Sequence, residues 1–302
     1  MKRILTILLA AVLLLSLVSC GDEPAPEDNT LTIAATTYPV YLFTTAITNG
    51  VDGVEVKLII NEQVSCLHDY TLTVKDMKII EQADIIVMNG AGLEDFMADA
   101  LAASDAEIID ASYGCIGLME AHGHEGHDHD TLYDAHIWLT PTNALTMLSI
   151  ISSRMCALNA DNTKQYETNF NSASAKLSEL EARCSEFSTL PTRNLITFHD
   201  GFRYFAEACG LTLLKSIEEE EGSEASAAEM KEIIALIEEY DIPAIFTEVN
   251  GSDATAQAIA RETGVEVYQL NMIMSGEGSG IQPYLDAMNA NYDTILRALG
   301  GE

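Results

Sequence analysis

One long helical pattern divides this sequence into two parts. Residues 162–187 contain neither Gly nor Pro. Their apolar side chains are sparse and helically spaced: Tyr166, Phe170, Leu177 and Leu180. A long helix that is polar on most of its surface is typical of a connector lying across a protein rather than of a core element. We therefore expect residues 159–190 to link two lobes, an N-terminal lobe over 31–158 and a C-terminal lobe over 191–302.

Short apolar runs alternate with helical patterns in both expected lobes. The predicted strands are 31–35, 54–60, 84–89 and 107–110 in the first lobe, and 194–198, 211–215, 243–247 and 265–270 in the second. The predicted helices are a stretch ending near Asn49 and residues 73–82, 92–103, 143–158, 201–209, 225–240, 254–263 and 284–299. Such alternation predicts an α/β fold in which each lobe has a parallel sheet flanked by helices. In 73–82 we expect Thr73 to be the N-cap and Val74, Met77 and Ile80 to form the apolar face.

The N-terminus has the composition of an export signal. Lys2 and Arg3 precede an apolar run, 4–18, which is shorter than the roughly 20 residues that span a bilayer. The run ends in LVSCG, typical of a bacterial lipoprotein signal, so we expect removal of 1–19 and lipidation of Cys20. An ordinary signal peptide with an incidental cysteine is the alternative. We then expect residues 20–30 to form an acidic tether, and the protein to lie outside the cytoplasm, anchored to the cell membrane by its lipid.

Charge and cysteine content exclude two classes of function. The chain has 15 Lys and Arg against 47 Asp and Glu, a formal charge of −32, whereas nucleic-acid binding needs basic patches. The cysteines other than Cys20 form no CxxC pair, so a thiolate zinc site is not indicated. Disulfides are permitted outside the cytoplasm, but the sequence leaves open how these five would pair: Cys66, Cys115, Cys156, Cys184 and Cys209.

Three isolated histidines have the positions expected of metal ligands. His136 lies beside the only tryptophan of the chain, and His68 and His199 each follow an apolar run. Glu248 and Asn271 also follow predicted strands. Ligands of open parallel sheets bind at the carboxyl ends of the strands, and neutral imidazole is the ligand that zinc takes most often. The sequence therefore predicts that His68, His136 and His199 meet around a transition metal.

A separate histidine-rich segment lies within residues 119–133. Its histidines have no periodic apolar partners, so it is predicted to be a loop. We expect it to offer weaker, exchangeable metal sites through His122, His124, His127 and His129. A solvated polar loop and an incidental metal-affinity tract are the alternatives.

Four motifs together resemble a known family. They are ADIIVMNG followed by GLEDF (83–96), LHDY (67–70), DAHIWLTPTNA (134–144) and FHDGFRYFAEACGL (198–211). In combination they resemble the zinc- and manganese-binding lipoproteins of ABC-type metal importers, the cluster A-I solute-binding proteins, over nearly the whole chain after residue 30. The resemblance implies two α/β lobes joined by a rigid helix, with metal in the inter-lobe cleft. It also implies that His68, His136 and His199 are the ligands, and histidine at the third position is typical of the zinc-binding members.

The chain departs from the family pattern at two positions. Leu67 stands where a proline usually precedes the first histidine, and Asn271 stands where many members have an aspartate ligand. The fourth ligand is therefore water, Asn271 or Glu248. Cys66 could also donate a thiolate, although a buried structural thiol is the favoured interpretation.

The resemblance implies a monomeric binding protein rather than an enzyme. The expected ligand is Zn²⁺, with Mn²⁺ less favoured, and the expected partner is the membrane permease of an ABC transporter. A zinc-dependent hydrolase is one alternative, because three histidines, a water and a base such as Asp200 or Glu248 would suffice. The sequence has no HExxH motif or nucleophile elbow to support it. A manganese-binding member of the family or an adhesin with a structural metal is the other alternative.

Overall fold

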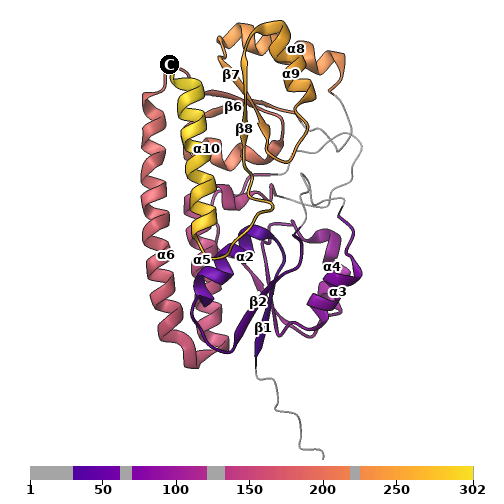
Figure 1. Ribbon diagram of the computed structural model, residues 1–302, viewed down its shortest axis with the longest axis vertical. Coiled ribbons are helices and arrows are strands. Elements are labelled where there is room, and N and C mark those ends of the chain that lie inside the picture. Colours follow the sequence, from indigo (N-terminus) through magenta and orange to yellow (C-terminus); the bar gives the residue numbers. More distant parts are fainter. Residues whose placement is uncertain (1–29, 62–69, 121–132, 218–224, 302) are drawn as a thin grey trace, which may run out of the picture. The chain divides into compact units, whose positions relative to one another are not determined.

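Two parallel sheets organise the residues that the computed structural model describes, which are 30–61, 70–120, 133–217 and 225–301. The first has the order β2-β1-β3-β4 and the second β6-β5-β7-β8, with every neighbouring pair parallel (Figure 1). The strands are β1 (Leu31–Ala35), β2 (Val54–Leu58), β3 (Ile85–Met88), β4 (Glu107–Asp110), β5 (Asn194–Thr197), β6 (Thr212–Ser216), β7 (Ala244–Glu248) and β8 (Glu266–Leu270). The predicted two-lobe α/β fold is confirmed.

The two sheets share one topology. In each, the first strand of the lobe pairs with the second on one side and with the third on the other, so that Ile33 is in register with Ile85, and Thr197 with Phe246. All strands run in the same direction, but the side of the first strand on which later strands are added changes between β1 and β3, and again between β5 and β7. Such switch points leave a crevice at the carboxyl ends of the strands, where ligands of this kind of fold bind.

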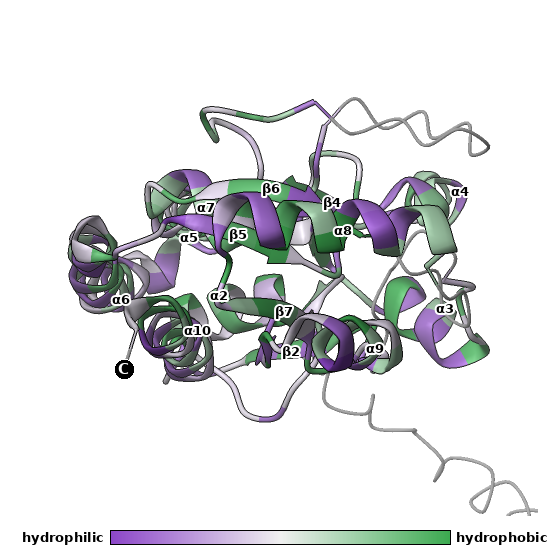
Figure 2. Cartoon of the chain, turned by 90° about the horizontal axis from the view of Figure 1, so that it is seen from above, coloured by the Kyte–Doolittle hydropathy of each residue, from purple (hydrophilic) through white to green (hydrophobic). Residues whose placement is uncertain are grey.

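The helices surround these sheets. They are α2 (Tyr38–Thr48), α3 (Val74–Glu81), α4 (Ala98–Ala102), α5 (Pro141–Leu158), α6 (Thr163–Arg183), α7 (Arg203–Ala208), α8 (Ala227–Tyr240), α9 (Ala254–Thr263) and α10 (Gln282–Gly300). The short 3₁₀ helices are η1 (Asp95–Met97), η2 (Ile137–Leu139), η3 (Ala160–Asn162), η4 (Cys184–Thr189) and η5 (Asp200–Phe202). The predicted linking helix is α6 continued by η4. It packs against α5, α2 and α10, and Figure 2 shows it beside α10. Its buried residues form one stripe, which includes Tyr166, Leu177 and Leu180.

The predicted helix over 92–103 is only partly present. Its first part is a turn, followed by η1 and α4. The carboxylate of Glu94 accepts hydrogen bonds from Thr36 Oγ1 (2.6 Å) and from the main-chain N–H groups of Asn89 (2.7 Å) and Gly90 (3.0 Å). Gly90, Ala91 and Gly92 have positive φ angles of 79°, 54° and 87°, a conformation that a right-handed helix excludes. The buried carboxylate thus holds a loop where periodicity alone predicts a helix.

The predicted apolar face of α3 is wrong in two of its three residues. Thr73 is the N-cap and forms a capping box with Asp76, as expected. Val74 and Met77, however, are 75% and 43% exposed, whereas Ile80 is buried. Asp76 is also buried, because its carboxylate accepts from Tyr70 Oη and from the Thr73 N–H and hydroxyl. The helix is therefore turned so that positions 76 and 80, one turn apart, face inward.

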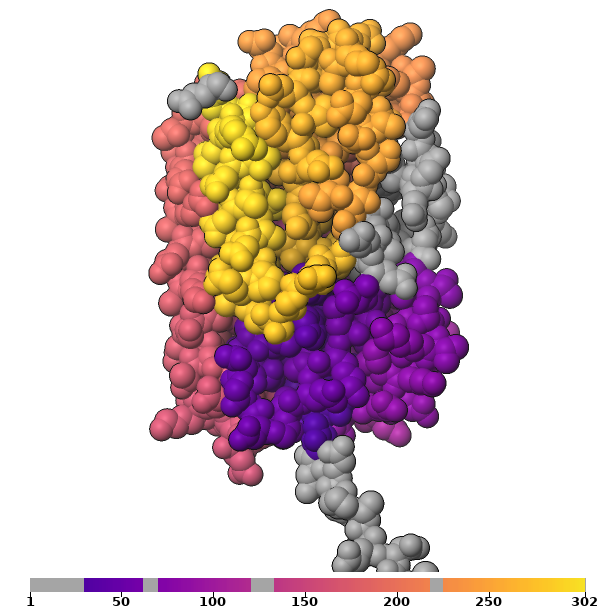
Figure 3. Space-filling view, in the orientation of Figure 1, coloured from indigo at the N-terminus to yellow at the C-terminus, as the bar shows by residue number. Residues whose placement is uncertain are grey.

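The larger of two apolar cores contains residues of both lobes. It extends from Ile33 and Ile86 through Trp138 to Phe246 and Tyr284. The smaller core lies between the second sheet and α8 and α9. The segment from β8 to α10 crosses to the first lobe (Figure 3). There Tyr38 Oη donates to Glu277 O (2.6 Å), and Gly280 N donates to Thr45 Oγ1 (2.8 Å). None of the helices within the described ranges combines the length and apolarity needed to cross a bilayer.

Candidate metal centre

His136 is held in one orientation by Asp134. Its main-chain N–H and its ring Nδ1 lie 3.0 Å and 2.8 Å from the same oxygen, Oδ1 of Asp134. Burial disfavours the charged form of the ring, but the hydrogen bond and charge of Asp134 outweigh this effect and raise the pKa of His136. Burial alone would raise the pKa of Asp134, but the hydrogen bonds and charge of His136 outweigh burial, so the pKa of Asp134 is lowered. In the neutral ring a proton on Nδ1 leaves the lone pair on Nε2, which is the nitrogen that could bind a metal ion.

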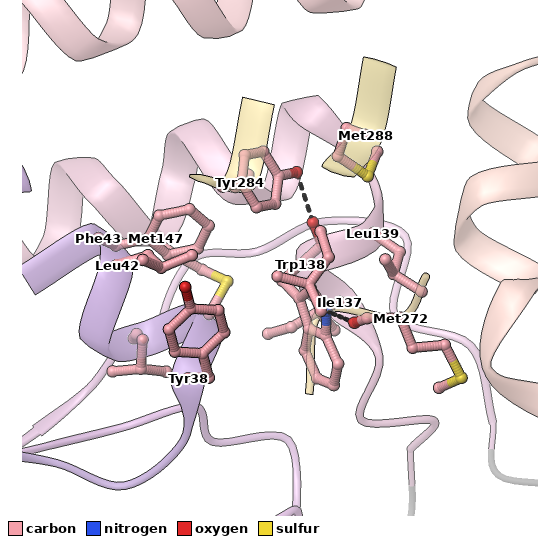
Figure 4. Packing of buried hydrophobic residues seen from close by; sticks show 14 of the residues in the cluster. Tyr38, Leu42, Phe43, Ile137, Trp138, Leu139, Met147, Met272, Tyr284 and Met288 are labelled. Carbon is pink, nitrogen blue, oxygen red and sulfur yellow. Dashed lines mark hydrogen bonds between the residues drawn. The ribbon is translucent and has the colours of Figure 1, made fainter. Parts of the chain in front are cut away.

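The residues after His136 fix this histidine to the second lobe. Trp138, in η2, is fully buried. Its Nε1 donates to the carbonyl of Met272 (2.8 Å), and its own carbonyl accepts from Tyr284 Oη (2.7 Å), as Figure 4 shows. Because Met272 follows β8 and Tyr284 lies in α10, the DAHIW segment is anchored to elements from the end of the chain.

His199 follows strand β5 and lies next to His136. Its carbonyl accepts from Thr197 Oγ1 (2.8 Å), which fixes the turn that follows the strand. The rings of His136 and His199 have centroids 5.5 Å apart and lie nearly perpendicular, at 84°. Two of the three predicted histidines therefore meet at the switch point between β5 and β7.

Glu248, the last residue of β7, lies next to His199. Its Oε1 lies 3.9 Å from Nδ1 of His199, and the residue is only 6% exposed. Within the described part of the chain Oε1 is a buried oxygen without a hydrogen-bond partner. Burial raises the pKa of Glu248 to about 7, opposed by the charge of His136. A buried acceptor without a donor is costly, and a cation beside it would remove that cost.

Asn271 is engaged elsewhere. Its Oδ1 accepts from the N–H of Ile273 (2.7 Å), a residue with a φ of 64°. Its main-chain N–H donates to Asn291 Oδ1, and its carbonyl accepts from Asn291 Nδ2, both at 2.8 Å. The side chain thus stabilises the turn after β8 and is less available to a metal than Glu248.

The other predicted ligands lie outside the described residues. These are His68, the neighbouring Cys66, the loop histidines His122, His124, His127 and His129, and the lipidation site Cys20. Within the described ranges no three or more His, Cys, Asp and Glu side chains are grouped closely enough to hold a metal ion. His136, His199 and Glu248 lie near one another, but these three residues alone are not grouped closely enough to hold a metal ion.

Comparison with known proteins decides the family. Residues 33–298 match the family described as "Zinc-uptake complex component A periplasmic", ZnuA. The chain belongs to the ZnuA family.

Individual ZnuA relatives match over most of the chain. The zinc-binding lipoprotein AdcA of Streptococcus pneumoniae (strain ATCC BAA-255 / R6) is 29% identical over 317 residues, which cover all of this chain but 62% of AdcA. The high-affinity zinc uptake system protein ZnuA of Bacillus subtilis (strain 168) is 28% identical over 310 residues, 96% of this chain and 95% of that protein. A crystal structure of ZnuA superposes with a TM-score of 0.76 at 28% identity, covering 89% of this chain and 99% of that one. The expected resemblance is confirmed.

Sequence reasoning overlooked two residues that shape the centre of this ZnuA family member. Asp134 could have been found from its D-x-H spacing, because a carboxylate two residues before an imidazole can reach its Nδ1. Gly201 could not: a Cβ at this position would lie 2.2 Å from Cε of Met272 and 3.0 Å from Cδ2 of His136. Only the folded arrangement shows that η5 must pass this close to the histidine ring.

Proposed function

We propose that this chain is the extracytoplasmic zinc-binding component of an ABC importer, which captures Zn²⁺ and delivers it to a membrane permease. The observation that carries the proposal is the convergence of two imidazoles and one buried carboxylate, His136, His199 and Glu248, at a strand switch point. Family membership, over residues 33–298, supports transport as the purpose of that site.

The proposed ligands are His68, His136 and His199, with Glu248 as the fourth. Zinc bonds of about 2.0–2.2 Å to nitrogen and oxygen place two ligand atoms of a tetrahedral site roughly 3.4 Å apart. The 3.9 Å between His199 Nδ1 and Glu248 Oε1 is close to that separation. We prefer Glu248 to Asn271 because Oδ1 of Asn271 already accepts a main-chain hydrogen bond. Three imidazoles favour zinc over manganese, which prefers oxygen donors.

Membership of a solute-binding transport family favours binding over turnover. A hydrolase would place a water on the metal beside a general base, whereas a carrier of this composition closes the coordination shell with protein ligands. A chain that hydrolysed ester or peptide substrates with bound zinc would be an enzyme instead. Binding of host proteins by the metal-free chain would favour an adhesin.

The remaining features of the proposal concern location. Lipidation of Cys20 would hold the protein at the cell membrane, where an acidic tether lets it reach the permease as a monomer. The histidine-rich loop would concentrate zinc near the entrance of the tight site.

Titration calorimetry of three single variants tests the proposal. His68→Ala, His136→Ala and His199→Ala should each weaken zinc binding roughly 100-fold or more, since each removes one of few strong donors. The matched control is His122→Ala, which should leave the tight site unchanged. Wild-type affinity in any of the three variants would remove that residue from the site, and a wild-type chain without a tight zinc site would contradict the function.

A further inference from the structure

Two thiols meet where the linking helix, α7 and α10 converge. Cys184 opens η4 directly after α6, and Cys209 is the C-cap of α7. Their Sγ atoms lie 3.6 Å apart, with Cys209 donating toward Cys184. We propose that Cys184 and Cys209 are joined by a disulfide bond in the exported protein. The inference uses the extracytoplasmic location, which is part of the proposed function, but it does not depend on zinc binding.

The geometry requires only a small movement. Bonded sulfurs are about 2.05 Å apart, so the gap to be closed is roughly 1.5 Å. A change of one staggered χ1 rotamer moves a sulfur atom by more than this distance. Both cysteines also lie at helix ends, where the main chain is least constrained by helical hydrogen bonds.

The other described cysteines have different surroundings. The sulfur of Cys115 lies 4.0 Å from the carbonyls of Ala111 and Asn143, and that of Cys156 lies 3.9 Å from the carbonyl of Thr163. Within the described ranges, neither sulfur has a hydrogen bond to another cysteine, in contrast to Cys184 and Cys209. Among these residues, Cys184 and Cys209 are thus the pair placed for oxidation, and Cys115 and Cys156 are predicted to stay reduced.

Cys184 is the thiol that would react first. It is half-buried, whereas Cys209 is 4% exposed. A hydrogen bond from Cys209 lowers the pKa of the Cys184 thiol to about 7, burial opposes this effect, and a contact with Tyr292 Oη at 3.1 Å adds to it. The hydrogen bond to Cys184 and burial both raise the pKa of Cys209. Of the two thiols, the more exposed Cys184 therefore supplies the nucleophilic thiolate more readily.

The oxidant is a protein disulfide of an extracytoplasmic thiol–disulfide oxidase. The Cys184 thiolate attacks one sulfur of that disulfide, and the other oxidase sulfur leaves as a thiolate. Cys209 then loses its proton and attacks Sγ of Cys184 in the mixed disulfide, which releases the second oxidase thiolate. Two protons and two electrons leave the cysteine pair, and the oxidase disulfide becomes a dithiol.

The bond would enclose the segment that carries His199. The two cysteines are 25 positions apart, and β5, His199 and η5 lie between them. Tyr292 of α10 packs edge-on against Phe187 and Phe205, with centroids 5.2 Å and 5.4 Å away, so the ends of this segment are already in place. A disulfide here would stabilise the fold mainly by restricting the unfolded chain.

Mass spectrometry of the exported wild-type chain tests the bond directly. The full chain is produced with its own leader, quenched in acid, alkylated with N-ethylmaleimide under denaturing conditions and digested without reduction. We expect a Cys184–Cys209 linked peptide, with Cys115 and Cys156 alkylated. Recovery of Cys184 and Cys209 in alkylated form, without the linked peptide, would overturn the inference.

Thermal unfolding with and without the phosphine reductant TCEP provides the second test. Reduction should lower the Tm of the wild type by roughly 5–15 °C. A Cys184→Ala/Cys209→Ala variant should not respond, whereas a Cys115→Ala/Cys156→Ala control should respond like the wild type. An equal response in the first variant would contradict the assignment. Zinc affinity should be the same in all of these proteins, so a chain that forms the bond but binds no zinc would refute only the proposed function.

Discussion

Asp134 and His136 share a single carboxylate oxygen: Oδ1 accepts both the main-chain N–H and the ring Nδ1 of the histidine two residues later. This arrangement fixes the position of the ring and its tautomer together. The second oxygen, Oδ2, is buried without a hydrogen-bond partner in the described part of the chain, and the nearest cation is Arg203 at 3.8 Å. A substitution at Asp134 therefore changes the orientation and charge environment of the His136 ring while keeping the histidine itself.

Asp134→Asn should weaken zinc binding by roughly 10- to 100-fold, the usual effect of losing a carboxylate behind a metal-binding histidine. The amide keeps an acceptor for Nδ1–H but loses the negative charge that makes the ring more basic. Zinc titration measures the effect. Asp293→Asn is the matched control, since Asp293 pairs with Arg183 on the surface, and equal affinities in the two variants would show that Asp134 has no special role.

Gly201→Ala should also lower zinc affinity, because the new methyl group would collide with Met272 and press on the edge of the His136 ring. Gly300→Ala is the control, since a Cβ there meets nothing within 4 Å. Adding Met272→Ala to Gly201→Ala separates the two contacts. Recovery of affinity in the double variant would assign the loss to Met272, and persistence would assign it to the ring.

Glu248→Gln and Asn271→Asp together identify the fourth ligand. If Glu248 binds the metal, replacing its carboxylate by an amide should weaken zinc binding at least 10-fold, the lower end for removing a metal-supporting group. Asn271→Asp should then change the affinity for zinc and the preference over manganese very little. The reverse pattern, tighter binding and a shift toward manganese in Asn271→Asp alone, would give the role to position 271.

Glu94 should make the stability of the metal-free protein depend on pH. Burial raises the pKa of Glu94 from 4.5 to about 7, although the hydrogen bonds from Thr36, Asn89 and Gly90 lower it. The folded state therefore holds a proton that the unfolded state releases between pH 4.5 and 7. Stability from this group is complete below pH 4.5 and is lost as the pH rises through 7, a change of about 3 kcal/mol.

Urea denaturation across this pH range measures the effect of Glu94→Gln. The free energy of unfolding of the variant, relative to wild type, should rise by about 3 kcal/mol between pH 4.5 and 8. Glu179→Gln, which removes an exposed carboxylate of α6, is the control. If the free energies of unfolding of wild type and Glu94→Gln changed equally across this pH range, Glu94 would be ionised in the folded protein throughout it.

Deleting residues 122–129 should leave the tight zinc site intact and reduce the number of weaker zinc equivalents. The four histidines of this loop have no regular pattern that would preorganise them. Calorimetry with excess zinc separates the two classes of site. Loss of the tight site in the deletion variant would mean that the loop supplies a primary ligand.

The strands and most helices could be predicted because their signals are local. For α9, the predicted and observed bounds coincide at 254–263, since Asp253 and Gly264 mark its two ends. The inward face of α3 was not predictable from apolar spacing, because one of the two residues buried on that face is Asp76. The burial of Asp76 depends on hydrogen bonds from Tyr70 and Thr73 rather than on hydrophobicity.

The candidate site could be predicted to a similar extent. Position at strand ends was enough to bring His199 and Glu248 into consideration, whereas His136 was noted because it lies beside the only tryptophan and in a motif that resembles the family. The choice between Glu248 and Asn271 required the structure, because it depends on whether a side-chain oxygen is already bonded to a neighbouring N–H. The need for glycine at position 201 follows only from its close approach to Met272 and His136, which are remote from it in sequence.

The hydrogen bond between Trp138 and the Met272 carbonyl has a spectroscopic consequence. The chain has one tryptophan, so all of its tryptophan emission comes from a single indole, which is fully buried and adjacent to His136, with ring centroids 5.3 Å apart. The same indole is tied to the loop after β8 through Nε1. Unlabelled protein therefore carries its own probe: a red shift reports separation of Trp138 from Met272, and slow deuterium exchange at Nε1 reports that the two remain together.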